Sequence, residues 1–309
     1  MADGSTTTWK GGTEHWTKKG EVKLFLWNKK PAAGRRKLGT ILFVHGSSMA
    51  SQPTFDLFVP GRPDSSAMDY FAGLGYDTWT MDNEGYGRSD KHRPQNNDIS
   101  NGADDLAAGS EYILRQTGEM QLLVYGISSG ALKAALFAER HPERVSRLAL
   151  DAFVWTGQGS PTLAERRKKL EQFKAVHRRP MDRAFVHSIF ERDHPGTADE
   201  ATIEAFADAI LALDDSVPTG TYVDMCSKLP LVDPEKIRAA TIVMRGEWDG
   251  IAGFDDLVEF FKRLPNADKQ FSVMKGISHA SFQQKNYYTV YHILHAFFSQ
   301  PEPVYTGEH

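Results

Sequence analysis

The chain has 309 residues, of which 40% are apolar and 25% are charged, a composition typical of a globular protein with a sizeable core. The formal net charge of -4 at pH 7 is small for this length and argues against nucleic acid or an anionic membrane surface as a partner. The single cysteine, Cys226, excludes a disulfide within the chain and lacks the paired spacing of a structural zinc site.

The amino terminus has no apolar stretch of the length that a signal peptide needs, and nowhere do 18 apolar residues follow one another. We therefore predict a cytoplasmic protein with no membrane partner. The segments before Trp9 and from Pro301 onward are predicted to be loose tails.

Short apolar runs alternate with helical patterns along most of the chain, which is typical of an α/β fold with a mostly parallel sheet covered by helices on both faces. Helical spacing is present over residues 131–138, 257–264 and 287–298. The predicted strands, with an eighth expected near residues 11–16, are 22–27, 40–44, 76–81, 121–125, 145–150, 241–244 and 270–274.

Residues 155–237 break this alternation. They contain no convincing strand, but two amphipathic stretches, 163–176 and 201–213, between prolines. We predict a helical cap over 155–237, inserted into an α/β core formed by residues 1–154 and 238–309. Such an insertion lies over the carboxyl ends of the strands, where open α/β sheets bind their ligands.

The sequence GISSG follows a predicted strand and precedes a predicted helix, and it contains two adjacent serines. A nucleophile at the tip of a sharp strand-to-helix turn needs very small residues two positions before and after it. Gly126 and Gly130 meet this need for Ser128, whereas Ile127 would clash in the equivalent position before Ser129. Ser128 is therefore the predicted nucleophile. The alternative is that both serines only cap the helix.

A serine hydroxyl reacts only when a base removes its proton, and the base is usually oriented by a carboxylate. The loop RGEWDGIAG places Asp249 after one late strand, and KGISHASF places His279 after the next. Asp249 is the favoured acid because it lies far enough beyond its strand to reach an imidazole. Glu247 and Asp151 remain alternatives.

The negative charge that develops on a substrate carbonyl oxygen requires preorganised donors, usually two backbone amides. One is predicted to be the amide of Ser129, after the nucleophile. The other is the amide of Ser47 in the loop VHGSSMAS, where Gly46 allows a tight turn. His45 is interpreted as bracing this loop.

Five motifs occur in an order that resembles α/β-hydrolase-fold serine hydrolases with a helical cap: HGSS, MDNEGYGRSD, GISSG, GEWD and GISH. The resemblance runs from about residue 22 to residue 298 and implies a catalytic triad of Ser128, Asp249 and His279. The chain departs from the family pattern at Glu84, where an arginine is usual, and in a longer segment after HGSS. A serine at the nucleophile position argues against dehalogenase or epoxide hydrolase chemistry.

The predicted function is hydrolysis of a carboxylic ester of a small or medium-sized substrate through an acyl-enzyme. Amide or carbon–carbon bond hydrolysis by the same triad is an alternative, as is a binding protein with little turnover. Met49, Phe153 and Trp155 are expected to line an apolar pocket. We expect no cofactor and no metal, and the sequence predicts no particular oligomeric state.

The cap is rich in basic residues, including RRKK at 166–169, Arg178 and Arg179. These side chains are suited to attracting an anionic acid or a coenzyme A thioester. Interleaved acidic residues at helical spacing favour a solvated helix face instead.

Overall fold

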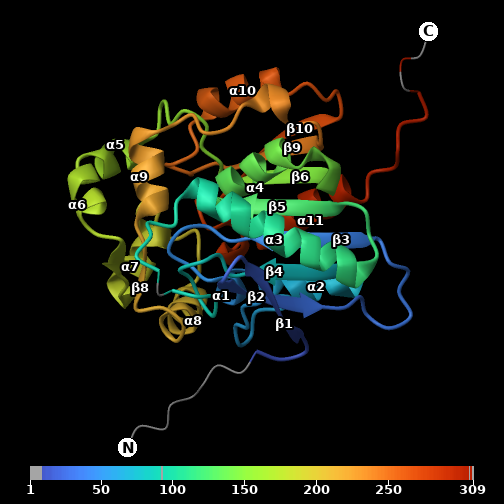
Figure 1. Ribbon diagram of the computed structural model, residues 1–309, viewed down its shortest axis with the longest axis horizontal. Helices are drawn as coiled ribbons and strands as arrows, with labels where there is room; N and C mark the ends of the chain where they lie inside the picture. Colours follow the sequence, from blue (N-terminus) through green and yellow to red (C-terminus); the bar gives the residue numbers. More distant parts are fainter. Residues whose placement is uncertain (1–8, 92, 306, 308–309) are drawn as a thin grey trace, which may run out of the picture.

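The computed structural model describes residues 9–91, 93–305 and 307. Its centre is a sheet of eight strands in the order β1-β2-β4-β3-β5-β6-β9-β10 (Figure 1). Strand β2 is antiparallel to both neighbours, and the remaining pairs are parallel. All eight predicted strands are confirmed: β1 (Thr13–Lys19), β2 (Val22–Lys29), β3 (Gly39–Val44), β4 (Tyr76–Met81), β5 (Leu122–Ile127), β6 (Val145–Asp151), β9 (Ala240–Gly246) and β10 (Lys269–Met274).

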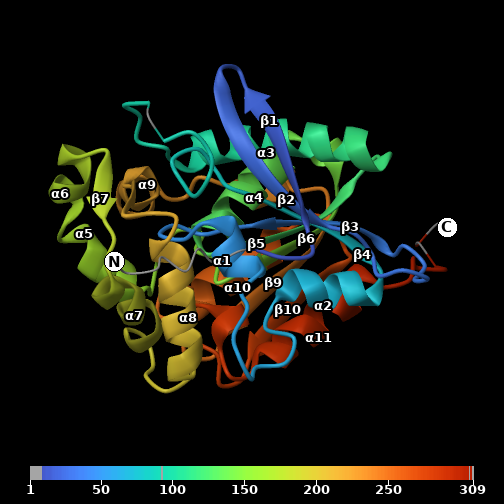
Figure 2. The same cartoon turned by 90° about the horizontal axis from the view of Figure 1, so that it is seen from below.

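Helices cover both faces of this sheet (Figures 1 and 2). Helices α3 (Ile99–Thr117), α4 (Ser129–Arg140) and α10 (Phe254–Arg263) pack on one face, and α2 (Ala67–Leu74) and α11 (Tyr287–Phe298) on the other. Side chains of a strand alternate between the two faces, so Leu42 of β3 joins the first core cluster and Phe43 the second. The α/β fold and the three predicted helices are thus confirmed. The short elements are α1 (Ser51–Phe55), η1 (Pro142–Arg144), η2 (Pro234–Lys236) and η3 (Ser281–Gln283).

The segment 155–237, which we call the cap, forms a separate group of elements at one end of the sheet (left in Figure 1). Its elements are α5 (Pro161–Arg167), α6 (Leu170–Ala175), β7 (Arg178–Pro180), α7 (Arg183–Glu191), α8 (Glu200–Leu211), β8 (Ser216–Pro218) and α9 (Gly220–Ser227). The expectation of no strand in the cap is wrong, because β7 and β8 form a two-stranded antiparallel sheet. Each has only three residues, too few to show a period of two in the sequence.

The cap and the loop after β3 share a small hydrophobic core that is separate from the two core clusters of the sheet. Val186 and Phe190 of α7 and Phe206 of α8 pack there with Met49 and Leu57 of that loop. The longer segment after HGSS therefore packs against helices of the cap. Within the described part of the chain, no helix has the length and hydropathy needed to cross a membrane. Residues 301–305 form no helix or strand, and the predicted tail before Trp9 lies outside the described residues.

Candidate active site

Ser128 lies at the turn between β5 and α4, with φ of 58° and ψ of -126°. A Cβ atom added to Gly126 would lie 2.5 Å from the carbonyl oxygen of Gly130, and one added to Gly130 would overlap the carbonyl oxygen of Val44. The two glycines are thus required for the strand and helix to pass so closely. The left-handed backbone of Ser128 is strained for a residue with a side chain and presents its hydroxyl at the tip of the turn.

His279 and Asp249 complete a continuous hydrogen-bonded chain with Ser128. The Nε2 atom of His279 lies 2.9 Å from the Oγ atom of Ser128, and its Nδ1 atom lies 3.1 and 3.2 Å from the two carboxylate oxygens of Asp249. All three side chains are buried, with exposed fractions of 7% for Ser128, 3% for Asp249 and 4% for His279. The distances meet the requirement for a base within hydrogen-bond reach of a nucleophile.

Asp249 is held in its ionised form. Burial alone would raise the pKa of its carboxyl, but the charge and hydrogen bond of His279, with the amides of Ile251 and Ala252, lower this pKa to about 2. An ionised carboxylate accepts the Nδ1–H of His279, which leaves Nε2 unprotonated and facing the hydroxyl of Ser128.

The two alternative acids are occupied elsewhere. Glu247 accepts a hydrogen bond from the amide of Gly276 at 2.8 Å, and Asp151 accepts one from the hydroxyl of Tyr125 at 2.6 Å. Burial raises the pKa of Asp151 to about 7, and the nearby charge of Asp249 acts in the same direction. Of these three carboxylates, Asp249 is the one that forms hydrogen bonds with the imidazole of His279.

The loop after β3 packs directly against the candidate nucleophile. A Cβ atom on Gly46 would lie 3.2 Å from the Cβ atom of Ser128. The hydroxyl of Ser47 donates to that of Ser129 at 2.7 Å, so the side chain of Ser129 ties the two loops together. Sequence reasoning had considered only the amide of Ser129. The amides of Ser47 and Ser129 thus lie on two segments that meet beside Ser128.

His45 braces this loop, as predicted. Its Nε2 atom accepts the amide of Asn83 at 3.0 Å, and its Nδ1 atom lies 2.8 Å from the carbonyl oxygen of Gly46. Burial and the charge of Lys133 lower the pKa of His45 well below its usual value, so the imidazole is neutral. The departure at Glu84 also has a local explanation, since Glu84 pairs with Lys19 at 3.1 Å and Arg93 at 2.5 Å.

A cavity of about 20 Å³ lies beside Ser128 and His279. The loop after β3 contributes Met49 to its wall, as predicted, whereas Phe153 and Trp155 are not part of it. Both pack in the core against Phe260, with ring centroids 4.7 and 6.0 Å away. The prediction that they line the pocket is corrected. Aromatic side chains after a strand suit a core and a pocket equally well, so their type could not decide it.

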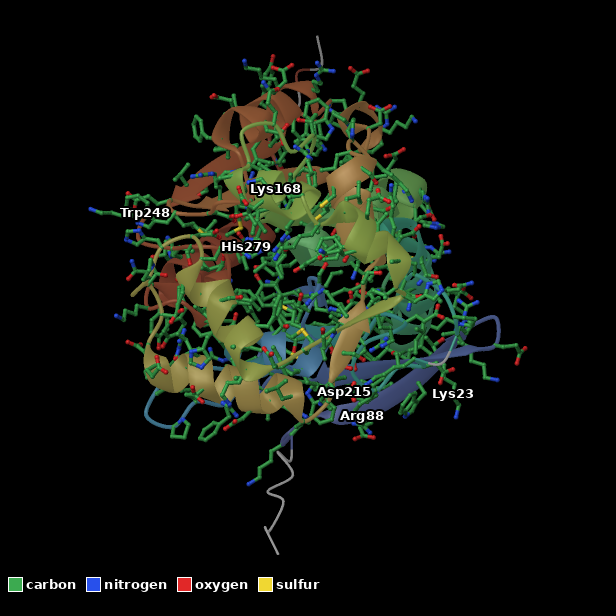
Figure 3. All side chains as sticks on the ribbon, turned by 90° about the vertical axis from the view of Figure 1, so that its left-hand side faces the viewer. Lys23, Arg88, Lys168, Asp215, Trp248 and His279 are labelled. Atoms are coloured by element: carbon green, nitrogen blue, oxygen red, sulfur yellow. The ribbon has the colours of Figure 1, made fainter. Side chains whose placement is uncertain are left out.

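The cap supplies site residues that were not among the predicted pocket residues, although Arg166 belongs to the basic run noted in the sequence. The same cavity is lined by Arg166 of α5, Tyr222 of α9 and Arg192, which follows α7. Asp193 has a carboxylate oxygen within 4.8 Å of the facing atoms of Asp249 and His279. Figure 3, seen from the cap side, shows His279 inside the outline of the molecule. No sequence motif marks these residues, since they become neighbours only when the cap folds over the sheet.

The carboxylate of Asp193 is paired with Arg192. Two hydrogen bonds of 2.8 Å join the side chains, and the hydroxyl of Thr162 lies 3.2 Å from the same carboxylate. Burial would raise the pKa of Asp193, but Arg192 lowers it. The cap therefore places an ion pair beside the histidine and its acid.

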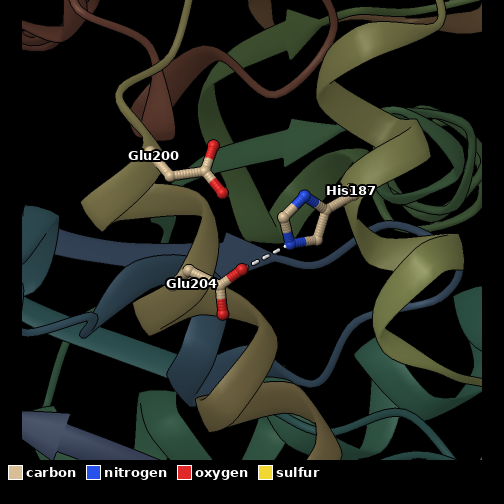
Figure 4. Close-up of side chains that lie close together, drawn as sticks. All are labelled: His187, Glu200 and Glu204. Carbon is tan, nitrogen blue, oxygen red and sulfur yellow. Dashed lines mark hydrogen bonds and ion pairs between the residues drawn. The ribbon is translucent and has the colours of Figure 1, made fainter.

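A second group of ligand-type side chains lies within the cap, although the sequence shows no metal-ligand spacing. The ligand atoms of His187 on α7 and of Glu200 and Glu204 on α8 lie within 4.8 Å of one another (Figure 4). The Nε2 atom of His187 is 2.6 Å from Glu204, which is also paired with Arg183. We interpret this group as an ion-pair network that joins α7 to α8.

A larger cavity, of about 670 Å³, lies away from Ser128, between the loop after β3 and α8. None of the described residues that line it is a histidine, and we place the chemistry in the smaller cavity, where the hydroxyl of Ser128 meets His279.

The sheet order, the strained serine turn and the hydrogen-bonded chain of serine, histidine and aspartate define an α/β hydrolase of the serine type. Comparison with protein families agrees: the chain belongs to the serine aminopeptidase S33 family, whose model matches residues 38–286. No curated protein sequence matches the chain.

Solved structures of the same fold are similar over nearly the whole chain. A monoglyceride lipase from Saccharomyces cerevisiae has 17% identity and a TM-score of 0.69, with 97% of each chain covered. A lipase described as putative, from Acinetobacter baumannii, has 16% identity and a TM-score of 0.67 over 95% of this chain and 94% of its own. An esterase from Thermogutta terrifontis has 17% identity and a TM-score of 0.64 over 93% and 99%. At these identities the likeness concerns the fold.

Proposed function

We propose that this protein is a carboxylic ester hydrolase that acts through an acyl-enzyme on a small or medium-sized substrate held beneath the cap. The observation that carries the proposal is the chain from Ser128 Oγ through His279 to an ionised Asp249, with 2.9 Å between the hydroxyl and the imidazole. The resemblance of the fold to that of esterases and lipases is consistent with it.

In this mechanism, Oγ of Ser128 attacks the ester carbonyl carbon while its proton passes to Nε2 of His279. The oxyanion is stabilised by the amides of Ser47 and Ser129. Collapse of the tetrahedral intermediate breaks the bond to the alcohol oxygen, which takes the proton from His279. Water then gives a proton to His279 and attacks the acyl carbon. The bond to Oγ of Ser128 breaks, Oγ takes the proton back from His279, and the acid is released.

Amide hydrolysis by the same residues is the second candidate, because the matched family is described as serine aminopeptidase. An aminopeptidase must accept a protonated α-amino group close to the scissile bond. The guanidinium group of Arg166 in the cavity wall, which has no carboxylate partner among the described residues, would repel such a group. The charge around the cavity therefore favours the ester proposal.

The first test is covalent labelling with a fluorophosphonate, followed by turnover of p-nitrophenyl esters of increasing acyl length. Ser128→Ala should abolish labelling and lower kcat by at least about 1,000-fold, because the nucleophile is lost. Ser129→Ala is the matched control, with the neighbouring hydroxyl removed.

Each alternative has its own outcome. Faster cleavage of a p-nitroanilide than of the p-nitrophenyl ester with the same acyl group would replace the ester proposal with amide hydrolysis. If the protein is neither labelled nor able to turn over any of these substrates, the result would indicate a binding protein. Full ester hydrolysis by Ser128→Ala would disprove the assigned nucleophile.

A further inference from the structure

Three arginines of the cap lie in or next to the wall of the cavity beside the candidate nucleophile. Arg166 lies at the end of α5, Arg179 on β7 and Arg192 after α7. The guanidinium carbons of Arg166 and Arg179 each lie 4.4 Å from the ring centroid of Tyr222. Arg166, Arg192 and Tyr222 share the cavity wall with Ser128 and His279, and Arg179 donates a hydrogen bond to the hydroxyl of Ser48 in the same wall.

Only one of these charges is neutralised by a carboxylate. Arg192 is paired with Asp193, as described above. Within the described ranges, neither Arg166 nor Arg179 forms an ion pair; Arg179 contacts only Ser48, the sulfur of Met181 and aromatic rings. Arg179 is 9% exposed, and its Nε atom has no hydrogen-bond partner. A buried charge is normally paired, so the unpaired guanidinium of Arg179, next to that of Arg166 in the cavity wall, favours the binding of an anion at this site.

The local electrostatics agree with this geometry. Burial lowers the pKa of Arg166, and the charges of Arg192 and Arg179 lower it further. Burial would raise the pKa of Tyr222, but Arg166 and Arg179 outweigh it and bring this pKa to about 8. The cavity therefore has a positive potential at neutral pH, which is unfavourable unless a negative group enters.

We propose that the cap arginine Arg166, assisted by the neighbouring charge of Arg179, binds a carboxylate of the substrate, so that the preferred esters are monoesters of small dicarboxylic acids. This inference rests on the proposed ester hydrolysis and adds the substrate class. A planar carboxylate matches the guanidinium fork of Arg166, which lines the cavity and has no carboxylate partner among the described residues. The cavity of about 20 Å³ holds roughly one water molecule, so a substrate enters only when side chains of the cavity wall rearrange, and the side chain of Arg166 is partly exposed to solvent.

The position of Arg166 in the cavity wall differs from the solvated helix face that the sequence favoured for the basic cap residues. Lys168, in the same RRKK run, follows that interpretation: it is 68% exposed and paired with Glu165 at 2.6 Å. Arg166, two positions earlier, faces the cavity instead. Figure 3 labels both Lys168 and His279 in the view from the side of the cap.

The test compares monomethyl glutarate with methyl pentanoate, which lacks the second carboxylate, by titration of released acid. The wild-type protein should prefer the anionic ester by about 10- to 100-fold in kcat/KM, the value of one or two charge-assisted hydrogen bonds. Arg166→Gln should lower this preference by about tenfold or more. Lys168→Gln, which removes the same charge from an exposed site, should leave the preference unchanged.

A second measurement works without turnover. Glutarate should protect Ser128 from fluorophosphonate labelling in the wild-type protein and in Lys168→Gln, and protect Arg166→Gln at least about tenfold more weakly. Equal cleavage of both esters, or the same preference in Arg166→Gln, would overturn the carboxylate site while ester hydrolysis stands. An unlabelled Ser128 with neither ester cleaved would instead refute the proposed function. Absence of protection by glutarate in a labelled wild-type protein would overturn the carboxylate site alone.

Discussion

Replacing Asp249 with asparagine tests the electrostatic core of the candidate site. The asparagine side chain has the same size as that of Asp249, and its carbonyl oxygen could still accept the amides of Ile251 and Ala252. Its amide nitrogen would donate to Nδ1 of His279, which forces the proton onto Nε2, the atom facing Ser128. The imidazole would then no longer accept the serine proton. In a serine protease the equivalent change lowers kcat by about 10,000-fold, so we expect a similar loss, about 5 kcal/mol of barrier.

The same substitution has a cost in stability. Burial works against the charged form of Asp249, yet its pKa falls from 3.8 to about 2 because of His279 and the two amides. At about 1.4 kcal/mol per pH unit, the ionised form stabilises the fold by about 2 kcal/mol. Because the folded pKa is lowered, this contribution is present above about pH 4 and is lost as the pH falls toward 2. Asp249→Asn should therefore lower the free energy of unfolding at pH 7 by about 2 kcal/mol.

The assays are ester hydrolysis and urea unfolding at pH 7. Glu247→Gln is the matched control, because its carboxylate contacts Gly276 and not His279. Asp249→Asn with activity within tenfold of wild type, together with a large loss in Glu247→Gln or Asp151→Asn, would refute the assignment of the acid.

Three further substitutions test the surroundings of the site. Burial raises the pKa of Asp151 to about 7, so the folded protein holds a proton that the unfolded chain loses above about pH 4. The free energy of unfolding should therefore fall as the pH rises from 4 to 7. Asp151→Asn should remove this loss, which urea unfolding at pH 8 should show as up to about 4 kcal/mol. The same pH dependence of stability in both proteins would contradict this prediction. Ser129→Ala keeps its backbone amide and loses only the hydrogen bond from Ser47, so its kcat should stay within about tenfold of wild type; a loss as large as that of Ser128→Ala would show that its hydroxyl reacts. Gly130→Ala should lower the free energy of unfolding by about 3 kcal/mol or more, because the new methyl group meets main-chain carbonyls; Gly73→Ala in α2 meets no atom within 4 Å and should be neutral or stabilising.

The elements of the core were predictable because each carries a local pattern. Apolar runs marked seven of the eight strands of the sheet, and the glycines around Ser128 identified the position of the proposed nucleophile through a steric argument on neighbouring residues. The short strands β7 and β8 escaped detection, since three residues cannot display a period. Phe153 and Trp155 were misplaced because aromatic type alone does not distinguish a core from a pocket.

The sequence by itself determined the class of fold, the turn that exposes Ser128 and the loops that carry Asp249 and His279, because each depends on spacing within a few residues of the chain. Only the tertiary structure decided which carboxylate contacts His279 and which cap side chains reach the cavity. Asp249 and Glu247 are two residues apart, and only the path of the folded loop turns one toward the imidazole. Arg166 and Lys168 are equally close in sequence, and the docking of α5 against α9 directs the first to Tyr222 and leaves the second in solvent. Contacts between distant segments depend on packing, and the sequence pattern of a helix records which residues share a face, but not what that face meets.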